Sequence, residues 1–249
     1  MRSRDVRATA AGVLFIIATG ASLTATGLLG SALDGPGFLT DVSLHQDRLL
    51  AAALFQLVAA FSSAAIAITF YPVLKEHSAG TALGAVAFRL IEGVFYALSA
   101  TGTLVLVALS EQVAAAATAS SSLQASAELL RSLRDAAGVV GVLAFYTGAT
   151  AYYLVFYRSR LIPRWLSAWG LAGTALGLVA GLLVLFQVVG TLSGVQVAFN
   201  LPIGVQEMVL AAWLIARGFS SPAPRPVLPD RVHRKLVSRR GPGPSPVLP

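Results

Sequence analysis

The chain of 249 residues contains no cysteine, and it is poor in charged residues. Without cysteine it cannot form disulfide bonds, thiolate metal sites or a cysteine nucleophile. Asp, Glu, Lys and Arg make up 12% of the residues, against about 25% in soluble domains, whereas 56% are hydrophobic and the mean hydropathy is +0.75. This deficit of charge indicates that lipid is the main solvent of the chain.

Motifs for metal binding and catalysis are also missing. The three histidines lie in separate polar stretches outside the apolar segments (His45, His77 and His233), without the spacing of a metal site. The sequence has neither a GxSxG elbow nor a GxxxxGK[ST] phosphate loop, and no Ser or Thr has a His or Lys at a spacing that would activate it. We therefore predict no metal ligand, no cofactor, no catalytic residue and no enzymatic activity.

The net charge of +7 and the isoelectric point near 10.4 do not indicate a nucleic-acid partner. Instead, the basic residues stand at the ends of long apolar segments, which is the pattern of a membrane topology signal. Only Lys75 and Lys235 are lysines among the 18 basic residues, a bias typical of a GC-rich bacterial genome. We therefore expect a bacterial plasma membrane protein whose main partner is the lipid bilayer.

Six apolar segments are long enough to cross a bilayer, which requires roughly 20 residues in a helix. They are residues 8–33, 49–74, 81–109, 136–157, 164–191 and 197–217. A helix satisfies its own backbone hydrogen bonds in lipid, so each segment is predicted to be helical. The first segment follows Arg2, Arg4 and Arg7 and has the charge pattern of a signal peptide, but its apolar part is too long, so we expect a retained helix.

The distribution of Lys and Arg predicts the orientation. Fourteen of them fall in the two terminal segments and in the second and fourth connections, against three (Arg48, Arg131 and Arg134) in the other connections. Because positive residues accumulate on the cytoplasmic side, both termini are expected there, which requires an even number of spans. The predicted fold is an all-α, polytopic bundle of six transmembrane helices in residues 1–219.

The connections on the outer side have two further signals. Ser43 and Gln46 have the spacing of a capping box, which would start the second helix. Residues 111–135 are rich in Ala and Ser, and three leucines in them predict a short helix on the outer leaflet. Those leucines are Leu123, Leu130 and Leu133. The fifth connection is predicted to be a few residues around Gly194.

Residues 220–249 form a basic, proline-rich tail that we expect to be disordered and cytoplasmic, because it has too few apolar residues to form a core. Three roles are open to such a tail. Its basic residues would bind anionic lipid head groups, its repeated Pro-Val-Leu-Pro would be a ligand for a partner protein, or it would act only as a solvated topology signal.

Polar residues recur at helical spacing inside three of the apolar segments, and such residues must point into a bundle. The third segment carries Arg89, Glu92, Tyr96, Ser99 and Thr103 on one face. The fourth carries Tyr146, Thr150, Tyr153 and Tyr157, and the sixth places Asn200 and Glu207 two turns apart. We predict an intramembrane polar cluster of Arg89, Glu92, Glu207, Tyr96 and Asn200.

The depths of the two acids support this cluster. At 1.5 Å per residue, Glu92 lies ~16 Å and Glu207 ~15 Å from the cytoplasmic ends of their helices. One arginine neutralises one carboxylate, so at least one of the two acids is predicted to hold a proton at neutral pH. The cluster either fixes helix packing in a structural or regulatory membrane component, or serves a small proton-coupled transporter that uses Glu92 and Glu207. An intramembrane enzyme would need a water-filled cavity and a nucleophile beside Glu92.

The fifth segment carries a ridge of glycines at Gly173, Gly177 and Gly181, which permits close approach of another helix. That helix belongs either to a second copy of the chain or to the same bundle. Since the bundle offers five partners, internal packing is expected.

Three stretches in this order resemble the bacterial membrane family called domain of unknown function 4386. They are Tyr-Pro-Val-Leu-Lys at 71–75 with Ala87 to Glu92, then Tyr157 to Leu166, and Leu201-Pro202 with Glu207 to Trp213 and Gly218-Phe219. The resemblance covers about residues 7–219 and implies a multi-helix inner-membrane protein, without supplying an activity. It places Arg89, Glu92 and Glu207 within the motifs of the family.

Overall fold

The computed structural model describes residues 6–35, 37–115, 121–191 and 193–220, and in these ranges it contains seven helices and no strand. The helices are α1 (Val6–Leu29), α2 (Phe38–Leu44), α3 (Gln46–Leu74), α4 (Ala79–Ala115), α5 (Ser121–Ser159), α6 (Arg164–Leu185) and α7 (Gly194–Arg217). All of them except α2 are long and apolar enough to cross a membrane. The prediction of an all-α protein with six spanning helices is confirmed.

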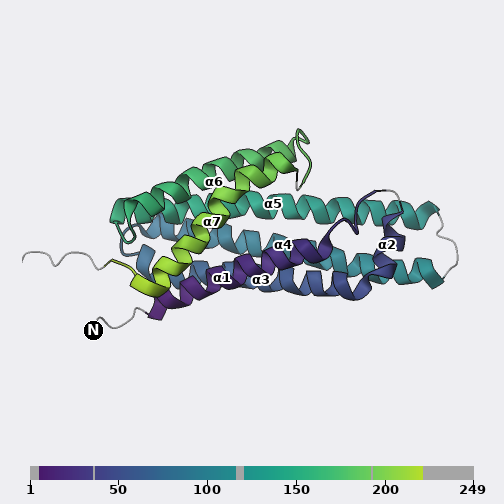
Figure 1. Ribbon diagram of the computed structural model, residues 1–249, viewed down its shortest axis with the longest axis horizontal. Coiled ribbons are helices and arrows are strands. Elements are labelled where there is room, and N and C mark those ends of the chain that lie inside the picture. Colours follow the sequence, from purple (N-terminus) through teal and green to yellow (C-terminus); the bar gives the residue numbers. More distant parts are fainter. Residues whose placement is uncertain (1–5, 36, 116–120, 192, 221–249) are drawn as a thin grey trace, which may run out of the picture.

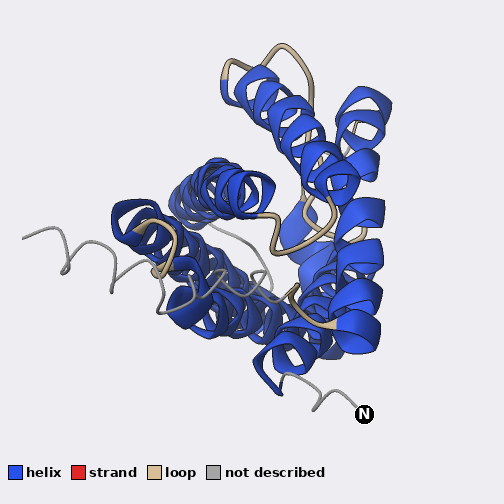
Figure 2. Cartoon of the chain, turned by 90° about the vertical axis from the view of Figure 1, so that its left-hand side faces the viewer, coloured by secondary structure: helices blue, strands red, loops and turns tan. Residues whose placement is uncertain are grey.

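The six long helices form a closed ring. Each contacts the next in the order α1, α3, α4, α5, α6 and α7, and α7 returns to contact α1. They run alternately up and down, so that the start of α1 and the end of α7 lie at the same end of the bundle (Figure 1). We call this the terminal end and the opposite one the far end; Figure 2 views the ring from the terminal end.

The ring has an apolar exterior and a partly polar interior. Large side chains such as Phe61, Ile68 and Val94 are exposed on its outer surface, whereas Arg89 and Glu92 are only 2% and 3% exposed. A water-soluble protein would not leave so many large apolar side chains at its surface. The outer face is therefore suited to lipid, and the interior of the ring is the place where polar chemistry is possible.

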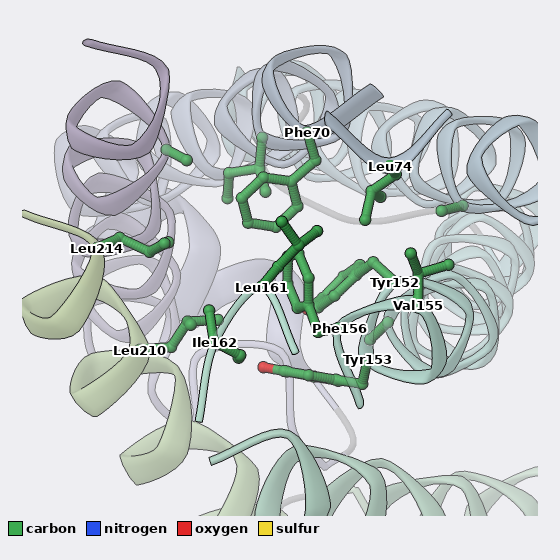
Figure 3. Close-up of a cluster of buried hydrophobic side chains, with 14 of the residues drawn as sticks. Phe70, Leu74, Tyr152, Tyr153, Val155, Phe156, Leu161, Ile162, Leu210 and Leu214 are labelled. Carbon is green, nitrogen blue, oxygen red and sulfur yellow. The ribbon is translucent and has the colours of Figure 1, made fainter. Parts of the chain in front are cut away.

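The terminal end of the ring is closed by aromatic and aliphatic side chains, many of which Figure 3 shows. Phe70 of α3 packs edge-on against Phe156 of α5 at a centroid distance of 5.1 Å, and Phe219, which follows α7, lies within about 6 Å of both rings. The backbone N–H of Ser220 donates to the carbonyl of Leu161 at 2.8 Å, which holds the end of α7 against the connection between α5 and α6. We call Phe70, Phe156 and Phe219 the aromatic seal.

The far end extends well beyond the spanning region. With 37 and 39 residues, α4 and α5 are each more than about 55 Å long, against a hydrocarbon core of about 30 Å. The short helix α2 packs beside them in a second apolar cluster (Figure 1). Arg131 of α5 lies over the ring of Phe38 in α2 at 4.8 Å and donates to the carbonyl of Leu33 at 2.8 Å, so it ties the first connection to α5.

This extension corrects the prediction for residues 111–135. Instead of a short helix on the membrane surface, these residues include the end of α4 and the first part of α5, which continues without a break to Ser159. Leu133 is 55% exposed on this helix. The Ala-rich sequence favours helix throughout, so α5 does not stop where its apolar segment begins.

Two further predictions at the far end are wrong. Ser43 lies within α2 and donates to the carbonyl of Thr40, so it does not cap α3, which begins at Gln46. The fifth span ends at Leu185 rather than 191, because Gln187 adopts φ 58° and the N–H of Val188 returns to the carbonyl of Leu183, a C-terminal cap. The predicted disordered tail lies outside the described residues, apart from Ser220.

Candidate functional site

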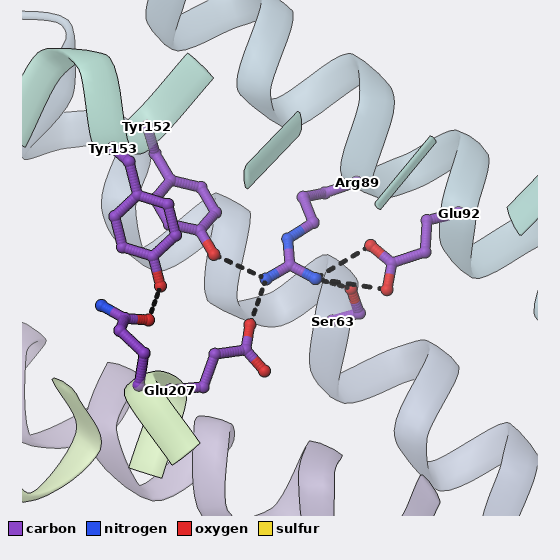
Figure 4. Close-up of polar contacts among 7 residues, drawn as sticks. Ser63, Arg89, Glu92, Tyr152, Tyr153 and Glu207 are labelled. Carbon is purple, nitrogen blue, oxygen red and sulfur yellow. Dashed lines mark hydrogen bonds and ion pairs between the residues drawn. The ribbon is translucent and has the colours of Figure 1, made fainter. Parts of the chain in front are cut away.

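Arg89 projects from α4 into the centre of the ring (Figure 4). Its Nη1 donates to the hydroxyl of Ser63 on α3 at 2.9 Å, and its Nη2 donates to the hydroxyl of Tyr152 on α5 at 3.2 Å. A charged side chain facing lipid is costly, so a span that contains Arg89 must turn this face inward. We call Ser63, Arg89, Glu92, Tyr152 and Glu207 the Arg89 cluster.

Glu92 is the direct counter-ion of this arginine. It lies one turn further along α4, and Arg89 Nη1 donates to both of its carboxylate oxygens, at 2.9 and 3.2 Å. Such charge-assisted hydrogen bonds are stronger than neutral ones, particularly where water is excluded. The pair forms within one helix, so it does not depend on the rest of the ring.

Glu207 reaches the cluster from α7, across the interior of the ring. Its Oε1 lies 3.7 Å from Arg89 Nη2, which is an ion pair but too long for a hydrogen bond, and this oxygen has no hydrogen-bond partner although it is buried. Figure 4 shows Glu207 on the side of the guanidinium opposite Glu92. The two acids thus differ in their contacts: both carboxylate oxygens of Glu92 accept hydrogen bonds from Arg89, whereas Glu207 forms only the longer ion pair.

Aromatic rings cover the guanidinium of Arg89. The Cζ atom lies 4.7 Å from the ring centroid of Phe145, 5.4 Å from that of Tyr152 and 6.0 Å from that of Phe15. Cation–π contacts of this kind compensate part of the lost hydration. Arg89 Nε is buried without an acceptor, so not all of the donors of the guanidinium are used.

The other two residues of the predicted polar cluster lie near the Arg89 cluster. Asn200 accepts a hydrogen bond from the hydroxyl of Tyr146 at 2.7 Å, which joins α5 to α7, and Tyr96 of α4 is partly buried beside them. Further along α5, Tyr153 is buried, whereas Tyr157 is 40% exposed near the terminal end. The predicted stripe of α5 therefore faces the interior over most of its length but not at Tyr157.

Several residues that complete the site are not predicted by the sequence pattern. Ser63 and Tyr152 bind Arg89, and Gln206, next to Glu207, accepts from the hydroxyl of Tyr153 and donates to the carbonyl of Leu166 at 3.1 Å. Gln206 could have been predicted, since it is a polar residue within an apolar segment. Ser63 and Tyr152 could not, because a lone serine or tyrosine is common in a spanning helix and their partner is on another helix.

A cavity of about 180 Å³ adjoins the Arg89 cluster, between α1, α3, α4, α5 and α7. Its polar lining residues are Thr19, Ser22, Ser63, Arg89, Glu92, Tyr96, Asn200 and Glu207. Phe15 and Phe145 supply apolar surface, and Leu23, also part of the wall, is 69% exposed, so the cavity reaches the outer surface of the bundle beside α1. A site of this polarity and size has room for several water molecules or a small solute.

The cavity occupies the half of the ring away from the aromatic seal. Counted at 1.5 Å per residue from the terminal end, Phe15 and Glu207 lie about 14 to 15 Å deep, and Leu23 and Asn200 about 26 Å deep. Phe70 and Phe156 lie within about 6 Å of the terminal ends of their helices. The interior is thus closed toward the terminal end and hollow toward the far end.

The glycine ridge of α6 packs inside the ring. A Cβ atom built on Gly173 would lie 3.0 Å from Ile203 of α7, one on Gly177 would lie 2.2 Å from the ring of Tyr146, and one on Gly181 would lie 3.0 Å from Leu143, both on α5. The ridge therefore lies against α5 and α7. Its close contacts place Tyr146 where its hydroxyl can reach Asn200.

Metal binding finds no support in the described part of the chain. No group of three or more His, Cys, Asp or Glu side chains in those ranges is arranged to hold a metal ion. Arg89 lies between Glu92 and Glu207, so the two carboxylates do not come together to share a metal ion.

The fold and the polar centre together define a multi-pass membrane protein built as a ring of six helices. The chain belongs to the family described as Domain of unknown function (DUF4386), whose model matches residues 10–218. No curated protein and no solved structure matches it. The matched region contains all six spanning helices in large part and every residue of the Arg89 cluster.

Proposed function

We propose that the protein is a structural or regulatory component of the bacterial plasma membrane, and that the Arg89 cluster fixes the arrangement of its ring. One observation carries this proposal: side chains from five of the six spanning helices contact Arg89. They are Phe15 of α1, Ser63 of α3, Glu92 of α4, Phe145 and Tyr152 of α5, and Glu207 of α7. A single side chain that joins so many helices favours one arrangement of the ring over others.

Replacing this arginine tests the structural role. Arg89→Gln leaves two buried acids without a counter-ion, so we expect the free energy of unfolding to fall by about 3 kcal/mol or more. Thermal unfolding of the purified protein in lipid nanodiscs measures the change. Arg158→Gln is the matched control, because Arg158 is exposed on α5, and it should shift stability by no more than about 0.5 kcal/mol. Equal stability of the two variants would contradict the proposal.

Several features of the proposal rest on the sequence. The excess of Lys and Arg in the terminal segments supports a cytoplasmic position for both termini. The basic tail supports contact with anionic lipid head groups. No histidine lies within an apolar segment, and no residue pattern provides an activated nucleophile, which supports a role other than catalysis.

A second candidate is a small proton-coupled transporter that uses Glu92 and Glu207. The observation that favours it is the cavity, which reaches both acids, together with the buried Glu207 Oε1 that has no hydrogen bond. An acid in such a place can exchange its proton with a solute that enters the cavity. The aromatic seal closes the terminal end, which agrees with one state of an alternating-access cycle.

The variant Glu207→Gln separates the two candidates, since it keeps the size of the side chain and removes the group that binds and releases a proton. If the protein is a transporter, the wild type should dissipate a pH gradient across proteoliposomes when solute is present, and the variant should lose this activity while keeping its melting temperature. If the protein is a structural component, neither the wild type nor the variant should dissipate the gradient faster than empty vesicles.

A further inference from the structure

We propose that the cavity beside Glu207 binds a small organic ammonium ion that enters from the far half of the ring. The proposal goes beyond the structural role of the Arg89 cluster and names a substrate class for the second candidate function. It concerns binding at equilibrium, so it is tested separately from transport.

The wall of the cavity contains more acidic than basic side chains. Arg89 Nη1 is shared between both oxygens of Glu92 and the hydroxyl of Ser63, so the guanidinium already has its counter-ion. Glu207 is a second acid with no cation of its own within hydrogen-bond distance. When both acids are ionised, the wall of the cavity carries one negative charge more than its arginine balances.

Glu207 lines the cavity without a hydrogen bond to its carboxylate. The residue is 8% exposed, and its Oε1 is buried 3.7 Å from Arg89 Nη2, too far for a hydrogen bond. Buried polar groups almost always have a hydrogen-bond partner, and one without a partner requires an explanation. A ligand in the cavity with an N–H donor and a positive charge would supply this carboxylate with a hydrogen bond and a second cation.

The other residues that line the cavity suit an amine with a short hydrocarbon chain. Phe15 and Phe145 offer apolar and aromatic surface to the hydrocarbon part of an amine, and Asn200 and Tyr96 add polar groups that fix its orientation. A volume of about 180 Å³ suits a short-chain primary amine rather than a large molecule. Leu23 lines the cavity and is exposed, and the aromatic seal packs across the terminal end, so we infer that the ligand enters from the far half of the ring.

Binding would exchange one proton for one ammonium ion, so the net charge of the site would not change. If Glu207 carries a proton in the empty cavity, that proton leaves to the solvent as the ammonium ion binds, and a carboxylate paired with an ammonium replaces a neutral acid. The titratable groups that face Glu207 are Arg89, Glu92 and Tyr96 of α4 and three tyrosines of α5, which are Tyr146, Tyr152 and Tyr153. The parts of α1 and α3 that line the cavity carry no titratable side chain.

Isothermal titration of the full chain in nanodiscs with butylammonium tests the proposal. Wild-type protein should bind butylammonium, and it should bind neither butanol nor butyrate, which share the alkyl group. Titration in two buffers of different ionisation enthalpy should show that protons are released on binding. Equal binding of butanol, stronger binding of butyrate, or binding without proton release would overturn the assignment.

Two variants locate the site. Glu207→Gln should weaken butylammonium binding by at least about tenfold, since it removes the charge that pairs with the ligand. Glu128→Gln is the matched control, because Glu128 is exposed on α5 outside the cavity, and it should bind as the wild type does. Unchanged binding in Glu207→Gln would show that the site lies elsewhere.

Gly204→Leu keeps the test valid if Glu207→Gln folds poorly. Gly204 lines the cavity, and a Cβ atom on it would meet no atom within 4 Å, so a leucine there is expected to extend into the cavity. Binding should be lost while the melting temperature is retained. Gly20→Leu is the control, because Gly20 is exposed on α1 and also has open space around it. Retained binding in a folded Gly204→Leu variant would refute the proposal.

Discussion

At the scale of single residues, two chemically identical acids at the centre of the ring have different contacts with Arg89. Glu92 is on the same helix as Arg89 and receives two hydrogen bonds from it, whereas Glu207 arrives from another helix and stops 3.7 Å away. An ionised acid in an apolar place needs a counter-charge or several hydrogen bonds. Glu92 has both, so Glu207 is the acid whose ionised form would be poorly compensated.

We therefore predict that Glu207 holds a proton at neutral pH when the cavity contains no ligand. Infrared spectra of the wild type should show the carbonyl stretch of a protonated carboxyl group, and this band should be missing in Glu207→Gln. The spectrum of Glu128→Gln should keep the band, since that side chain is exposed. A wild-type spectrum without such a band would contradict the prediction.

Much of this site could be predicted from residues spaced along one helix, because a charged or polar stripe in a spanning helix must face the interior of the bundle. Arg89, Glu92, Tyr96 and the buried Ser99 form such a stripe. The partners on other helices could not be predicted, since the rotation of α3 and α5 about their axes is set by packing. Tyr152 shows this: its neighbour Tyr153 belonged to the predicted stripe, but Tyr152 is the tyrosine that binds Arg89.

At the scale of helices, contacts between glycines and aromatic rings hold α5 and α6 together. Gly170 and Gly177 of α6 lie against the rings of Tyr153 and Tyr146, so close that a Cβ atom on either glycine would overlap the ring. Both tyrosines in turn hydrogen-bond to α7, through Gln206 and Asn200. The small residues of α6 thus determine where α5 presents its polar groups.

Gly177→Ala tests this arrangement. The new methyl group would lie 2.2 Å from the Tyr146 ring, so the ring must move, and we expect a loss of about 1 to 3 kcal/mol in the free energy of unfolding. Gly20→Ala is the control on α1, where a methyl group has open space and alanine favours the helix, so that variant should be as stable as the wild type or slightly more stable. Equal stability of the two variants would show that the contact does not matter.

Hydropathy predicts the number of spanning helices, but it does not predict where several of these helices end. Hydropathy does not detect the backbone cap at Gln187, so it extended α6 by six residues. It also does not detect helix in water, where Ala-rich residues continue α5 from Ser121. The short helix α2 was missed because its seven residues are held by contacts with α3 and α4, not by a pattern of their own.

At the scale of the whole molecule, the even number of spans places both described ends of the chain on one side (Figure 1). The connection after α3 and the one after α5 lie on that same side, and the projecting parts of α4 and α5 lie on the other (Figure 1). The excess of Lys and Arg predicts that this side is cytoplasmic.

The absence of cysteine makes this topology simple to test with single-cysteine variants. In intact cells, Glu128→Cys should react with a membrane-impermeant maleimide, whereas Glu76→Cys should react only after the membrane is permeabilised. Both positions are exposed, so a difference in labelling reports the side of the membrane. The opposite labelling pattern would reverse the predicted orientation.

The contact between α1 and α7 has a consequence for biosynthesis. Gly12 of α1 packs directly against Ala211 and Ile215 of α7, so the ring cannot close until α7 has been synthesised. Before that point Arg89 already has Glu92 beside it on its own helix, and α4 therefore enters the bilayer as a nearly neutral segment. Glu207 has no basic residue one turn away on α7, so its burial coincides with the closure of the ring.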